Sequence, residues 1–231
     1  MQKALENIAP GVTNSNKTLV LLGTSAGTAL TAATSAFNLS NLPAAGWSIN
    51  VVDGVANLTN FFTGGGINGA GILMMDSSSN VGGGATGAEV GVFTTYATTI
   101  DSFLGGGGGL FSQANGYGWV NALVPGLTVV SHSSTGLALS ATGIAAFPGL
   151  NNGDLSSGPW HNSFTTTGTL PILATSTVNG EAVILGAHGG SVTAPVPVGQ
   201  VPDTGSTLIL MLGSMGSLLG GRFLKKRSVR A

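Results

Sequence analysis

The chain contains no cysteine, which excludes disulfide bonds, thiolate metal sites and a cysteine nucleophile. Lysine and arginine together number seven among 231 residues, and none of them lies between residues 18 and 221. Proteins that bind nucleic acid need these side chains to replace the counterions of the phosphates. The sequence therefore excludes a nucleic-acid partner.

Acidic residues are spread through the same stretch that lacks basic ones. They are Asp53, Asp76, Glu89, Asp101, Asp154, Glu181 and Asp203. Lysine and arginine salt bridges cannot form within this stretch, so apolar burial and hydrogen bonds must stabilise it.

The basic residues gather instead at the C-terminal end, after an uncharged and mostly apolar run over residues 206–221. Residues 206–224 number 19, and a helix of that length covers about 28 Å at about 1.5 Å per residue. This is close to the ~30 Å apolar core of a bilayer. The run has no polar stripe at helical spacing, which argues against an amphipathic or buried helix. We therefore predict a single C-terminal transmembrane helix. The basic residues at its end should stay in the cytoplasm as a stop signal; they are Arg222, Lys225, Lys226, Arg227 and Arg230.

The segment Val201-Pro202-Asp203-Thr204-Gly205 stands directly before this run. The order of motif, apolar span and basic end resembles the exosortase-dependent sorting tails of Gram-negative bacteria, the PEP-CTERM class. It is most similar to the variant whose signature is Val-Pro-Asp-Ser-Gly, with Thr204 in place of the serine. The resemblance covers residues 201 to 230. It implies recognition by a membrane-embedded sorting enzyme, removal of the tail, and delivery to the cell surface or matrix.

The N-terminal part is expected to begin with a disordered leader over residues 1–17, which is polar and contains Pro10. Residues 18–36 allow two interpretations. They can form the apolar segment of a signal peptide, or a strand over residues 18–22 followed by a helix through Ala36. Leucine and valine crowd into the first five positions, and Gly23 and Gly27 weaken a continuous apolar helix, which favours the strand.

Strand-like and helix-like segments then alternate along the chain. Strands are predicted at residues 18–22, 48–52, 71–75, 110–112 and 127–130, and helices at 55–62, 85–104 and 117–123. This alternation is typical of βαβ units and a parallel sheet. Residues 172–175 and 182–185 are expected to form a closing pair of strands. The resulting domain should span residues 18–190, with a proline-rich linker at 191–200 before the tail at 201–231.

Three segments carry a second resemblance. They are residues 100–111, beginning Ile-Asp-Ser-Phe; residues 117–126, beginning Tyr-Gly-Trp; and residues 158–175, beginning Gly-Pro-Trp-His-Asn. Together they resemble uncharacterised sorting-tail proteins whose body is like a class I glutamine amidotransferase domain. The resemblance implies an α/β, flavodoxin-like parallel sheet with helices on both faces.

The matching place for a nucleophile is near residues 110–115, where Ser112 lacks the flanking glycines of a nucleophile elbow. We interpret it as an ordinary serine at the end of a strand. His132, His161 and His188 match no ligand spacing, and Asp53 and Asp76 should cap the loops that follow them. His161 is expected to pack with Trp160 in a loop. No catalytic residue, metal site or cofactor is predicted.

Two functions remain in view. The first is an exported, exosortase-processed surface or matrix protein with a catalytically degenerate body and a structural or adhesive role. Its expected partners are the sorting enzyme, the inner membrane during export, and exopolysaccharide. The second is a surface hydrolase or metal-dependent enzyme on the same fold. The absence of lysine and arginine to hold an anionic intermediate favours the first.

Overall fold

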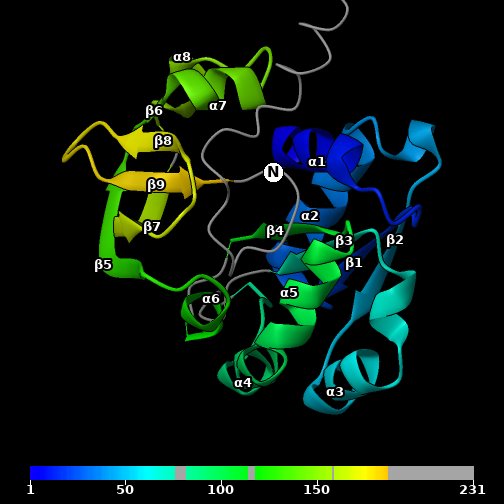
Figure 1. Cartoon of the computed structure of the whole chain (residues 1–231). Helices are drawn as coiled ribbons and strands as arrows, with labels where there is room; N and C mark the ends of the chain where they lie inside the picture. Colours follow the sequence, from blue (N-terminus) through cyan, green and yellow to red (C-terminus); the bar gives the residue numbers. More distant parts are fainter. Residues whose placement is uncertain (76–81, 114–117, 158, 187–231) are drawn as a thin grey trace, which may run out of the picture. The chain divides into compact units, whose positions relative to one another are not determined.

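The computed structural model describes residues 1–75, 82–113, 118–157 and 159–186 (Figure 1). Its first part is a four-stranded parallel sheet of order β2-β1-β3-β4. The strands are β1 (Thr18–Leu22), β2 (Ser48–Val52), β3 (Ile72–Met75) and β4 (Gly109–Ser112). The predicted α/β class and the parallel sheet are therefore confirmed, as are four of its five predicted strands and the strand interpretation of residues 18–22.

Helices cover both faces of this sheet. Alternate residues of a strand point to opposite faces, and both sets are apolar in β1 and β3. Leu19 and Leu21 pack in one core with α1 (Gln2–Ile8) and α2 (Gly27–Leu39). Val20 and Leu22 pack in another core with α3 (Val55–Thr63), α4 (Gly87–Thr95), α5 (Ala97–Gly105) and α6 (Gly118–Leu123). In Figure 1, α1 and α2 lie above the sheet and α3, α4 and α5 below it.

The predicted disordered leader is wrong over its whole length. Residues 2–8 form α1, and beyond it the amide of Thr13 donates to the carbonyl of Gly107 and the side chain of Asn14 to that of Ala70. Leu5 is 0% exposed and belongs to the core around α2. Apolar side chains at Ala4, Leu5 and Ile8 have helical spacing, and Glu6 accepts hydrogen bonds from Gln2 (2.9 Å) and Lys3 (2.7 Å). A short polar segment was therefore sufficient to form a docked helix.

The single helix predicted over residues 85–104 is divided in two. Tyr96 ends α4 and begins α5 with φ −103° and ψ 19°, outside the helical region. Its ring stacks on Phe62 of α3, with 5.1 Å between the ring centroids. The two threonines before it donate their hydroxyl groups to backbone carbonyls one turn earlier, Thr94 to Val90 and Thr95 to Gly91. Such bonds weaken a helix locally.

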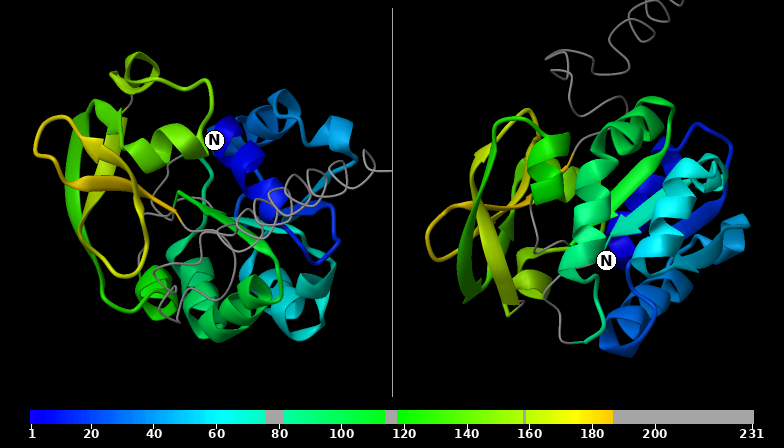
Figure 2. Two further views of the ribbon diagram at one scale, coloured as in Figure 1. Left: turned by 45° about the horizontal axis from the view of Figure 1, so that its top comes forward. Right: turned by 90° about the horizontal axis from the view of Figure 1, so that it is seen from below.

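A second, antiparallel sheet follows the parallel one, in the order β5-β7-β9-β8-β6. Its strands are β5 (Leu127–Thr135), β6 (Leu137–Leu139), β7 (Pro159–Thr167), β8 (Ile172–Ser176) and β9 (Ala182–Leu185). The short helices α7 (Ala141–Ala146) and α8 (Asn152–Leu155) lie between β6 and β7 in the chain, and three short 3-10 turns lie at Ala9–Gly11, Pro43–Ala45 and Gly66–Gly69. Figure 2 shows these green-to-orange strands gathered in a sheet of their own.

This second sheet corrects two predictions. Residues 127–130 do form a strand, but it pairs with β7 and not with the parallel sheet. Trp160 and His161 lie on β7 and not in a loop. The predicted closing pair is confirmed, since β8 and β9 are antiparallel neighbours. Serine is frequent in β5, and it gives a weaker strand signal than valine or isoleucine.

Two β-bulges interrupt the pairing of β5 with β7. Thr128 faces Thr166 while Val129 faces Phe164, which leaves Thr165 as an extra residue on β7. Farther along, Ser131 faces Asn162 while Ser134 faces Trp160, so the extra residue lies on β5. Bulges bend a strand and change the direction of its side chains, and both bulges adjoin the site described below.

Candidate functional site

Ligands of open parallel sheets bind where the strand order changes direction, at the carboxyl ends of the strands. Here that place lies between β1 and β3. Within the described residues, backbone atoms of the protein occupy it. The amide of Ala29 donates to the carbonyl oxygen of Gly82 at 3.0 Å. A Cβ atom on Gly27 would lie 2.1 Å from that same oxygen. The contact leaves no room for a ligand between the first turn of α2 and the segment at Gly82.

Two carboxylates lie near this edge, and both hold loops in place. Asp53 follows β2; its side chain accepts a hydrogen bond from Ser25 (2.6 Å) and its carbonyl one from Asn57 (2.8 Å). Glu89 is 4% exposed and accepts from the amides of Gly54 (2.8 Å) and Thr86 (2.7 Å). It forms a capping box with Thr86 at the start of α4. The Asp53 carboxylate therefore bonds the segment after β1, and not the loop that follows Asp53 as the sequence predicted.

The other predicted positions are not brought together. Ser112 is the exposed last residue of β4, while His132 and His161 lie on β5 and β7 of the second sheet. Within the described residues, no three histidine, aspartate or glutamate side chains are grouped as metal ligands would be. Asp76, His188, the 201–205 motif and the basic cluster all lie outside the described residues.

A polar cluster that the sequence does not suggest links four segments of the second sheet. Glu181, at the start of β9, accepts a short hydrogen bond from the buried hydroxyl of Ser163 on β7. Its carboxylate oxygen lies 3.7 Å from Nδ1 of His132 on β5. Asn179, in the turn between β8 and β9, lies 3.0 Å from the same Nδ1. The His132 ring packs edge-on against Trp160, with centroids 5.0 Å apart.

These contacts determine the charge of Glu181. The hydrogen bond from Ser163 is the main cause that lowers the pKa of its carboxyl group below the ordinary value, and Asn179 and His132 lower it further. Partial burial opposes the shift but does not cancel it. Glu181 is therefore an anion at neutral pH, with a partly exposed side chain.

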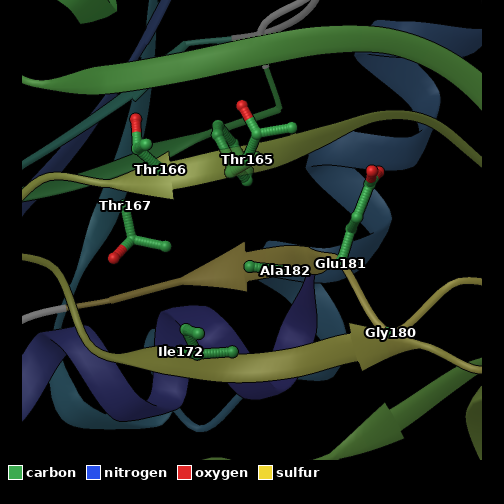
Figure 3. A pocket seen from close by; sticks show the side chains of 8 residues that line it. Thr165, Thr166, Thr167, Ile172, Gly180, Glu181 and Ala182 are labelled. Carbon is green, nitrogen blue, oxygen red and sulfur yellow. The ribbon is translucent and has the colours of Figure 1, made fainter.

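Beside this cluster the second sheet opens into a pocket, shown in Figure 3. Within the described residues of β7 and β9, the two strands pair at one position only, where Phe164 faces Ala182. Beyond that pair the two strands diverge, and a solvent-open cavity of about 530 Å³ lies between them. Its walls are Phe164, Thr165, Thr166, Thr167, Ile172, Gly180, Glu181 and Ala182.

The chemistry of this pocket is uncharged apart from one carboxylate. Three successive threonines supply hydroxyl groups, which can accept hydrogen bonds and, at Thr165 and Thr167, also donate them. Phe164, Ile172 and Ala182 supply apolar surface. Thr165 is the bulged residue of β7, and Thr166 also donates to the carbonyl of Gly126 (2.7 Å). Such a surface can bind a ligand that offers many hydroxyl groups and an apolar face.

Part of this site had a sequence signal. The run Ser163 to Thr167 is rich in β-branched and aromatic residues, which favours a strand. Asn179-Gly180 is a typical hairpin turn between two such runs. Neither signal indicates that β7 and β9 diverge, because the pairing depends on residues far apart in the chain.

Comparisons with protein-family models, with characterised proteins and with solved structures find no match to this chain. Across the described ranges, no helix is both long enough and apolar enough to span a membrane.

The low pKa of Glu181 can be tested by NMR titration of its carboxyl group. We expect the pKa to lie below that of an ordinary glutamate and to rise toward it in Ser163→Ala, because the main stabilising hydrogen bond is lost. A group with a lowered folded pKa adds stability above its unfolded pKa and loses it as pH falls through the folded value. Acid should therefore destabilise the wild type below about pH 4.5 more steeply than Glu181→Gln. Equal acid sensitivity in the two proteins would contradict the shift.

Proposed function

We propose that this chain is an exported bacterial protein that a membrane-embedded, exosortase-type enzyme processes and delivers to the cell surface or extracellular matrix. The single observation behind this is the order of parts at the C-terminal end. A Val-Pro-Asp-Thr-Gly motif at 201–205, an uncharged apolar run at 206–221 and a basic end at 222–230 follow one another there.

The body supports a structural or adhesive role over a catalytic one. We propose that it is a flavodoxin-like, catalytically degenerate relative of class I glutamine amidotransferase domains. The order β2-β1-β3-β4 agrees with the first four strands of the 2-1-3-4-5 order found in flavodoxin-like folds. Close packing of Gly27 on Gly82 fills the place where such folds hold a ligand. The Ser/Thr-rich second sheet then provides the exposed surface for contacts in a hydrated polysaccharide matrix.

Neutralising the basic end tests the role of the tail. Replacement of Arg222, Lys225, Lys226, Arg227 and Arg230 by glutamine should remove the stop signal. The protein should then no longer be held in the inner membrane with its body outside. Reporter fusions at the C-terminal end measure this topology. The matched control replaces Lys3 and Lys17, which are also basic but lie in the N-terminal part, and should leave the topology unchanged. Unaltered topology in the five-residue variant would argue against the proposal.

A further inference from the structure

We infer that the pocket between β7 and β9 is a binding site for a neutral glycan. This inference deepens the proposed function and rests on it, because it names the class of matrix component that the body contacts. The volume of about 530 Å³ lies within the range of roughly 300 to 1,000 Å³ that small-molecule sites occupy.

The lining matches the two requirements of a sugar ring. Its hydroxyl groups need partners that donate and accept hydrogen bonds, and the hydroxyls of Thr165 and Thr167 can do both. The Thr166 hydroxyl already donates to the carbonyl of Gly126, so it offers an acceptor only. Its C–H face needs apolar surface, which Ile172 offers with 38% of its surface exposed. Phe164 also lines the pocket, although it is partly buried and packs against the core. The bulge at Thr165 leaves this residue without a pairing partner on β5, and Thr165 lines the pocket.

Charge decides which glycans fit. Glu181 is an anion at the rim, and no lysine or arginine exists between residues 18 and 221 to offset a second negative charge. Glycans that carry uronate, sulfate or phosphate groups would therefore be repelled. Glu181 is already held by Ser163 and His132, so its carboxylate acts as a fixed acceptor rather than a partner for a cation.

The test uses the full chain in mild detergent and isothermal titration with cellohexaose, laminarihexaose and maltohexaose, with an oligogalacturonate of equal length as the anionic probe. At least one neutral hexasaccharide should bind with 1:1 stoichiometry, and the galacturonate should not. Thr165→Val removes one hydroxyl at nearly constant shape and should weaken binding roughly three- to tenfold. Thr165→Trp should obstruct the pocket with a bulky side chain and abolish binding.

Thr128→Val is the matched control, because Thr128 is an exposed β-strand threonine on β5 outside the pocket, and it should bind as the wild type does. Equal melting temperatures of the three variants would show that each is folded. The inference is wrong if no neutral hexasaccharide binds, if galacturonate binds equally well, or if Thr165→Trp still binds. Binding of an extended peptide in place of any glycan would also overturn it. None of these results bears on the sorting tail, so the topology experiment remains an independent test of the proposed function.

Discussion

Trypsin digestion of denatured protein recovered from the cell surface should leave one long fragment that begins at Thr18. Trypsin cleaves after lysine and arginine, and the last such residue before the body is Lys17. The next one is Arg222, so an uninterrupted span of more than two hundred residues carries no cleavage site. If the sorting enzyme cuts near Thr204 or Gly205, the fragment ends there, and its mass gives the position of the cut.

The control for this digestion is recombinant full-length protein, produced in cells that lack the sorting enzyme. It should give a fragment from Thr18 to Arg222. The same fragment in surface-recovered material would show that the tail is kept as an anchor, and the processing proposal would be wrong.

Removal of the tail also changes the charge of the protein. Residues 1–203 keep Lys3 and Lys17 against eight carboxylates, which gives a formal net charge of −6. The whole chain sums to −1. A body of this charge repels its own copies and stays soluble, as a protein released into a matrix must.

Gly27→Ala should destabilise the protein strongly, by about 3 kcal/mol or more. Two effects add at this position. Its φ of +65° lies in the left-handed region, which costs an L-residue roughly 1–2 kcal/mol. The new Cβ would also lie 2.1 Å from the carbonyl oxygen of Gly82 and 2.8 Å from its carbon, and backbone atoms cannot move aside cheaply. Denaturant unfolding measures the loss.

Gly46→Ala separates the two effects. Gly46 has a φ of +83°, but no heavy atom lies within 4 Å of the Cβ it would gain. The free energy of unfolding should therefore fall only by the cost of the left-handed backbone conformation, roughly 1–2 kcal/mol. Alanine restricts the unfolded chain similarly at both positions, so that contribution cancels in the comparison. Equal losses in the two variants would mean that the loops at Gly27 and Gly82 are not in close contact.

The parallel sheet could be predicted because its strands are short apolar runs between glycine-rich or aspartate-containing ends. Residues 18–22 and 72–75 are buried on both faces, and such strands carry no polar alternation. The docking of α1 could not be predicted in this way, since Leu5 is the one fully buried side chain of this short helix. Its burial depends on a core formed by residues far along the chain.

The pocket could be predicted even less. Glu181, Ser163 and His132 are isolated polar residues in the sequence, and only the pairing of β5, β7 and β9 brings them together. The register shift that leaves Thr165 unpaired follows from packing across two strands. Sequence periodicity describes one strand at a time, and so it cannot show where two strands separate.

The bulges of the second sheet have a further consequence for β5, which stands at the end of the strand order. An edge strand of nine residues invites pairing with a neighbouring molecule and aggregation, and many proteins prevent this with lysine. β5 itself contains no lysine. The irregular register between Ser131 and Ser134 instead bends the strand, so a straight partner cannot follow it. Protection by shape is not screened by salt, and it should persist at ionic strengths that would weaken a charged edge.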